Sequence, residues 1–338
     1  MCMACELLTG LDPEAMAPAE GLPRYPVHFP DGTGGAEVSA LYPPVDGGSA
    51  AGRLWRVPSP RSNRHWRAGE FGPALDRLAS DPTAAVSLGI AAAAFIDFGP
   101  VRLAKQAGRL FRATPFVVAF PTPYTIIAGL DDARFSPALM AAVERCLVAE
   151  IRELLQAVPA EELAIQFDVC AETRIWESRG RELGGPRELP ERLLESAVKI
   201  AEAVPVESGL GWHFCSRGSR AGVGAPHDAA QVTRLAGAII ASTDRQPHFV
   251  DIPVPASRDD ADYFAPLANL ALWPTMDVFL ALVHAGDDVE KAWRRFYAAS
   301  TVLSRFGISP ACGSPPEQVL PVLGQLLARG APEVPYHE

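Results

Sequence analysis

Short runs of apolar residues alternate with longer amphipathic segments through most of the chain. The short runs are rich in β-branched and aromatic residues and are bounded by Gly, Pro and Asp, which is typical of buried parallel strands. They predict strands at residues 92–97, 116–120, 163–168, 209–215, 248–253, 278–284 and 306–308. An eighth strand is predicted at residues 25–29, in a first stretch that is rich in Pro and Gly.

The longer segments carry apolar residues at the three- and four-residue spacing of a helix that packs one face on a core. In residues 136–157 this stripe consists of Leu139, Val143, Leu147 and Ile151. Ser136 precedes it and is followed by a proline, which suits a helix N-terminus. Similar stripes predict helices at residues 190–203, 228–241, 259–272, 288–305 and 316–329.

The regular alternation of strands and helices favours an α/β protein with parallel strands. We predict one (β/α)8 TIM barrel domain over residues 1–338. Residues 1–70 form an irregular N-terminal extension that includes the first strand. An open, doubly wound sheet is the alternative that the pattern leaves.

The composition limits which partners the protein can bind and in which compartment we expect it. A formal charge of −10 argues against a broad grip on nucleic acid or anionic lipid, because both need clustered Lys and Arg. The longest apolar run, residues 88–96, is too short to span a bilayer, and the first residues lack the basic cluster of a secretory signal. We therefore expect a cytoplasmic protein with no nucleic-acid or membrane partner, and the sequence is compatible with a homodimer.

Residues with reactive side chains stand at or just beyond the ends of the five predicted strands from residue 163 onward. They are Asp168, Cys170, His213, Cys215, Asp251, His284 and Cys312. In a (β/α)8 barrel the carboxyl ends of the strands meet at one face, and active sites lie there. We predict that these residues surround one active site.

His213, Cys215 and Cys312 are the predicted ligands of a zinc ion. His213 and Cys215 are two positions apart in an extended segment, so their side chains point the same way. Zinc binds His nitrogen and Cys sulfur readily, and a catalytic zinc needs only three protein ligands. Cys312 follows the last strand and supplies the third ligand from across the barrel mouth. The alternative is that all three residues are ordinary members of a buried core.

The other residues at this face are candidates for catalysis or substrate binding. Asp168 and His284 could orient a substrate or carry its proton, or could only hold the loop and the turn that follow them. Cys170 either lines the site or packs in the core. Arg217 lies in a Gly-rich loop at residues 216–224 and either binds an anionic substrate group or is simply exposed.

Five segments of the chain contain motifs that can be compared with those of known families. They are FVVAFPTPYT at 116–125, LAIQFDVCAE at 163–172, GWHFCSRG at 211–218, VFLALVHAGDD at 278–288 and FGISPACGSPPE at 306–317. Together they resemble the uroporphyrinogen decarboxylase/cobalamin-independent methionine synthase superfamily, and specifically its zinc-dependent, thiol-alkylating branch. In that branch the positions of His213, Cys215 and Cys312 are zinc ligands. The first segment adds Tyr124 to the candidate substrate-binding residues.

The resemblance implies transfer of a methyl or alkyl group from a small donor to a small-molecule thiol that is activated as a zinc-bound thiolate. Asp168, His284 or Asp251 would orient the donor or handle its proton. The chain has Asp251 where methionine synthases have a glutamate ligand, and Asp168–Val169–Cys170 where they have Asp-Glu-Pro. The expected activity is therefore thiol alkylation rather than methionine synthesis itself. A metal-independent decarboxylase or lyase and a non-catalytic thiol-binding protein are the alternatives.

Overall fold

The computed structural model describes residues 41–42, 53–54, 57–59, 71–107, 114–128, 136–174, 176, 191–215, 229–270, 276–303 and 306–329. Nine strands within these residues form one sheet, in the order β2-β1-β9-β8-β7-β6-β5-β4-β3. The strands are β1 (Leu41–Tyr42), β2 (Arg53–Leu54), β3 (Val57–Pro58), β4 (Phe116–Pro121), β5 (Leu163–Val169), β6 (Gly209–Phe214), β7 (Phe249–Pro253), β8 (Asp277–Val283) and β9 (Gly307–Pro310).

From β3 to β9 every strand runs parallel to its neighbour and lies beside the strand that follows it in the chain. A doubly wound sheet would reverse this order at a switch point, so that alternative is wrong for the described part of the chain. β1 adds to β9 in the antiparallel direction and pairs with β2.

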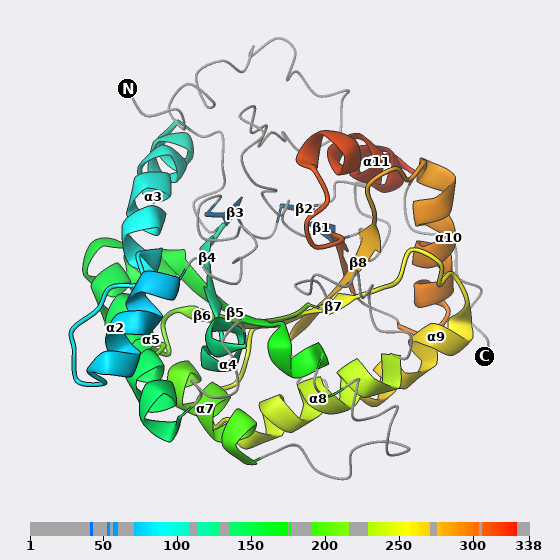
Figure 1. Cartoon of the computed structure of the whole chain (residues 1–338). Helices are drawn as coiled ribbons and strands as arrows, with labels where there is room; N and C mark the ends of the chain where they lie inside the picture. The colour runs from blue at the N-terminus through cyan, green and yellow to red at the C-terminus, as the bar shows by residue number, and fades with distance from the viewer. Residues whose placement is uncertain are drawn as a thin grey trace.

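Helices lie outside the sheet, which curves around the centre of the molecule (Figure 1). The long helices are α2 (Gly72–Ser80), α3 (Ile90–Gln106), α5 (Pro137–Ala157), α7 (Glu191–Ala201), α8 (Ala229–Ser242), α10 (Val289–Ser300) and α11 (Pro316–Ala328). Shorter helical segments are α4 (Pro123–Ile127), η2 (Ala160–Glu162), α9 (Ala261–Phe264) and η3 (Ala265–Asn269). Among the described residues, no helix combines the length and apolarity needed to cross a membrane.

Six of the predicted strands are confirmed as β4 to β9, with bounds within two residues of those expected. The predicted helices from residue 136 onward are confirmed as well, except that residues 259–272 divide into α9 and η3. Pro266 lies in the first turn of η3, and its missing N–H prevents a continuous α-helical ladder through this point. The strand predicted at residues 25–29 lies outside the described residues.

The strand predicted at residues 92–97 is wrong, because this segment lies inside α3. Its run of alanines has the strongest intrinsic preference for helix. The N-cap residue, Gly89, has no side chain to accept the first helical N–H groups, and the carboxylate of Glu150 on α5 accepts them instead. Its Oε1 accepts from the N–H of Gly89 at 2.9 Å and its Oε2 from that of Ala91 at 2.7 Å. The sheet position before β4 is therefore held by β3.

The two faces of the sheet have different roles. One face packs beneath the helices in the main core, which includes Phe167, Trp212 and Leu280. The other face carries a small separate cluster that consists of Val117, Ala164, Phe249 and Phe279. Since strand residues two apart share a face, the second face also carries the residues two positions after each of these along the strands.

Phe249 and Phe279 fit on this inner face because the neighbouring strands present glycines to them. A Cβ atom at Gly211 would overlap the ring of Phe249, and one at Gly307 would overlap the ring of Phe279. The two rings pack edge to face with centroids 6.2 Å apart. The two rings form an apolar layer on the inner face, which we call the floor. It lies beside Gly211 and Gly307, two residues before His213 on β6 and Ser309 on β9.

The close fit of Phe249 against Gly211 leads to a prediction about stability. Gly211→Ala should lower the free energy of unfolding by about 1–3 kcal/mol, because the added methyl group displaces the Phe249 ring in a packed site. Urea unfolding followed by tryptophan fluorescence would measure it. The matched control is Gly237→Ala in α8, where nothing lies within 4 Å of the added Cβ. That change should raise stability by about 0.4–1 kcal/mol. Equal effects of the two changes would contradict the proposed fit.

Candidate metal centre

β6 determines the direction of two of the three predicted ligands. It is paired with β5 on one side and with β7 on the other, which fixes the pleat of the strand. The N–H of Cys215 donates to the carbonyl of Val169 at 3.3 Å, so the ladder continues one residue beyond β6. His213 and Cys215 consequently project from the same face, and both are buried.

Cys312 reaches the same place from a tight turn after β9. The N–H of Ser314 donates to the carbonyl of Ala311 at 3.0 Å, and Gly313 has a φ of 72°. This is the third position of a turn that requires positive φ, where glycine is free of the strain that a side chain would add. The Ser314 hydroxyl accepts from the N–H of Ala285 at 3.3 Å, which ties the turn to the segment after β8.

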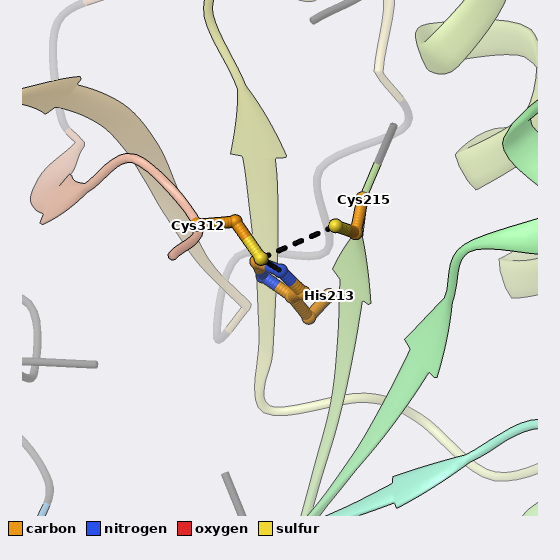
Figure 2. Close-up of side chains that lie close together, drawn as sticks. All are labelled: His213, Cys215 and Cys312. Atoms are coloured by element: carbon orange, nitrogen blue, oxygen red, sulfur yellow. Dashed lines mark hydrogen bonds between the residues drawn. The ribbon is translucent and has the colours of Figure 1, made fainter. Parts of the chain in front are cut away.

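The three side chains converge. Cys312 Sγ lies 3.4 Å from His213 Nε2 and 3.2 Å from Cys215 Sγ, and all three ligand atoms lie within 4.8 Å of one another. Figure 2 shows the imidazole and the two sulfur atoms pointing toward a common centre, with Cys312 arriving from a different segment. The cluster could hold a metal ion.

The spacing of the donor atoms fits a tetrahedral metal. Zn–S bonds of about 2.3 Å and Zn–N bonds of about 2.0–2.1 Å place tetrahedral ligand atoms roughly 3.4–3.8 Å apart. The separations of 3.4 Å and 3.2 Å from Cys312 Sγ lie at or just below this range, so the cluster needs only a slight opening there. Neither cysteine is in a disulfide, and the same holds for Cys146 and Cys170.

Cys170 supports Cys215 from the neighbouring strand end. A hydrogen bond with Cys170 is the main reason that the pKa of the Cys215 thiol is well below its usual value, and hydrogen bonds with Cys312 and His213 add to it. The same bond, together with burial, raises the pKa of Cys170 well above its usual value. The bond therefore favours the thiolate form of Cys215 over that of Cys170. A thiolate is the form of cysteine that binds metals.

Asp168 lies beside His213, since the two residues are register partners in β5 and β6. Its Oδ1 accepts from Gln166 Nε2 at 2.9 Å. Its carbonyl accepts from the N–H of Thr122 at 3.3 Å and from the hydroxyl of Thr125 at 3.4 Å, which binds the start of α4 to the end of β5. The pairing of β5 with β6 therefore brings Asp168 beside His213 of the cluster, and its catalytic role stays a prediction.

Asp251 and His284 occupy different positions relative to the cluster. Asp251 is buried next to the His213 imidazole, with its Oδ2 3.7 Å from Nδ1. His284 follows β8, where its N–H donates to Asp287 Oδ2 at 2.7 Å in a turn that includes Gly286 at a φ of 79°. The turn sets the backbone of His284, as one of the two sequence interpretations expected. Its ring is not among the converging ligand atoms.

The remaining predicted substrate-binding residues are less informative. Tyr124 lies in α4 and is partly buried against the main core. Arg217 and its Gly-rich loop lie outside the described residues, so their role stays a prediction. Cys146 packs in the main core, as its place in an amphipathic helix indicated.

Two residues near the cluster were not singled out from the sequence. Ser309 of β9 donates to Asp251 Oδ1 at 2.8 Å. Glu172 is buried after β5 and accepts from the hydroxyl of Thr125 at 3.2 Å. The signal for Ser309 was its position two residues after Gly307, on the inner face of β9. Glu172 ends the LAIQFDVCAE segment, but nothing in the sequence indicated that its carboxyl group is buried.

No protein-family model matches the chain, and no curated protein matches it significantly. The geometry of the cluster and its surroundings therefore carries the functional argument.

Glu172 provides a pH-dependent prediction. Burial raises its pKa above the ordinary value of 4.5, although hydrogen bonds with Thr122 and Thr125 oppose the shift. A raised acid pKa means that stability is fully present below the unfolded pKa and is lost as the pH rises through the folded pKa. Glu172→Gln should therefore raise the melting temperature at about pH 7.5, and the gain should shrink as the pH approaches about 4.

Differential scanning fluorimetry across this pH range measures the effect. The control is Glu161→Gln, at an exposed position before β5, which removes one negative charge but changes no buried carboxyl group. A gain of the same size and pH dependence in that control would assign the effect to net charge rather than to the buried site.

Proposed function

We propose that the protein transfers a methyl or alkyl group from a small-molecule donor to a small thiol, at a zinc centre held by His213, Cys215 and Cys312. The observation that carries the proposal is the convergence of these three ligand atoms, within 4.8 Å of one another, at the carboxyl ends of parallel strands. The motif resemblance to the zinc-dependent, thiol-alkylating branch of the superfamily supports the same activity.

The donor set favours zinc over other common ions. One imidazole and two thiolates suit a borderline-soft cation, whereas magnesium and calcium require oxygen ligands. Three protein ligands correspond to a catalytic rather than a structural site, because the remaining position is open to a substrate. When bound, zinc supplies the Lewis acidity that keeps a thiol deprotonated at neutral pH.

The surrounding residues are suited to the transfer step. The thiol sulfur forms a bond to the donor carbon with its own electron pair. The bond between that carbon and its leaving group breaks at the same time, and its electrons depart with the leaving group. We propose that Asp168, which lies half-buried beside His213, and His284 orient the donor or carry the thiol proton. Tyr124, Cys170 and Arg217 are the proposed contacts for the two substrates.

We also propose that the sheet closes into a (β/α)8 barrel. The singly wound strand order, the helices outside the sheet and the inner-face cluster of Phe249 and Phe279 support this architecture. The cysteines at the site are not in disulfides, which suits a reducing compartment, and we propose the cytoplasm.

Metal analysis tests the proposal most directly. Protein purified under reducing conditions should contain one zinc per chain, measured by inductively coupled plasma mass spectrometry. Cys312→Ala and Cys215→Ala should each lose the metal. Thiol consumption with simple alkyl donors should fall by at least about 100-fold in both variants, because the activated thiolate is lost. Cys146→Ala is the matched control, since this cysteine packs in the main core away from the cluster.

The outcomes separate the candidate functions. A metal-free Cys312→Ala protein with full turnover would rule out the zinc-dependent transferase. Loss of a carboxyl group from a substrate without any metal requirement would identify the lyase of the same superfamily. Tight thiol binding without turnover against any donor would identify a non-catalytic binding protein.

A further inference from the structure

The two nitrogens of His213 face different groups. Nε2 lies 3.4 Å from Cys312 Sγ, and Nδ1 lies 3.7 Å from Asp251 Oδ2. The sulfur atoms and the carboxylate are therefore on opposite edges of the imidazole ring. A carboxylate oxygen could also bind a metal. Among the described residues, however, the ligand atoms that converge belong to His213, Cys215 and Cys312, and Asp251 is not one of them.

Asp251 is held in place on its other side. It is the register partner of His213 across β6 and β7, and its side chain is 3% exposed. Its Oδ1 accepts a hydrogen bond from Ser309 Oγ at 2.8 Å, and Ser309 is also buried. In the intervening strand, β8, the register partner of Ser309 is the small residue Ala281.

These contacts give the two carboxylate oxygens separate partners. Ser309 fixes Oδ1, so Oδ2 is the oxygen turned toward the imidazole. A buried carboxylate at this position favours a proton on Nδ1, which leaves the lone pair of Nε2 directed at the sulfur atoms. The 3.7 Å separation is longer than a hydrogen bond, and a small rotation of the ring would close it.

We infer that Asp251, anchored by Ser309, is a positioning residue that fixes the tautomer and the orientation of His213 as a metal ligand through Nε2. The inference rests on the proposed metal centre. It assigns Asp251 a role different from the catalytic one expected from the sequence, and it assigns a function to Ser309. It also means that Asp251 does not take the glutamate's place as a fourth ligand, so this position stays open to the thiol.

Zinc affinity, rather than turnover, tests the inference. Apparent dissociation constants would be measured by competition with a chromogenic chelator for the wild-type protein and for Asp251→Ala, Asp251→Asn and Ser309→Ala. Asp251→Ala should weaken zinc binding by about 10–100-fold. Asp251→Asn keeps an acceptor for Nδ1–H but loses the charge, so a smaller loss is expected. Ser309→Ala should weaken binding several-fold, and it keeps the test available should Asp251→Ala not fold.

Asp97→Asn is the matched control, because Asp97 is also a buried aspartate that accepts from a serine, Ser59, but lies on α3. It should leave zinc affinity unchanged. Cobalt-substituted protein adds a second readout. Its visible spectrum should be the same in the wild type and in Asp251→Asn, because the ligand set is unchanged. A shifted spectrum would show that Asp251 is itself a ligand and would overturn the inference.

Failure of the inference is distinct from failure of the proposed function. A wild-type protein that binds no zinc removes the metal centre altogether. A wild-type protein that binds zinc, with unchanged affinity in both Asp251→Ala and Ser309→Ala, keeps the metal centre and overturns the positioning role alone.

Discussion

The alternation of side chains along buried parallel strands is the constraint on which the candidate site depends. β6 is paired on both sides, so residues two apart along it must share a face. Gly211, His213 and Cys215 form one such series, and Phe249 and Asp251 on β7 form another. A slip of one residue in the register of β6 would turn His213 beneath the helices and replace it on the inner face with Trp212 or Phe214.

The same alternation stacks apolar residues below polar ones. Phe249 and Phe279 fill the space beneath the cluster because Gly211 and Gly307 have no side chains that would overlap their rings. Water is therefore excluded from below, and the hydrogen bonds above the floor act in a medium of low dielectric constant, where they are electrostatically stronger. The fold thus provides two things to the cluster, namely fixed directions and a dry base. The directions of His213 and Cys215 and the apolar base come from strand geometry, whereas the turn after β9 directs Cys312.

Much of the site was predictable from the sequence because it follows from strand period and from residue type. His213 and Cys215 were recognisable as an extended pair, and Cys312 stood just after a strand. The contributions that escaped prediction are tertiary. Residues 92–97 form a helix whose N-terminus is satisfied by Glu150 from another helix, and no local pattern encodes such a cap. The contact between Ser309 and Asp251 likewise joins two strands separated by a third.

The arrangement around the cluster explains why three ligands can be sufficient. Cys170 brings a third sulfur to the neighbourhood and forms a hydrogen bond with Cys215, but it is not one of the converging ligand atoms. Asp251 also stands close, but on the far side of the His213 ring. In the proposed zinc centre, each of these residues would support a ligand without becoming one. A structural metal site would recruit them to complete a closed tetrahedron, whereas a site that must admit a substrate sulfur benefits from keeping them one contact away.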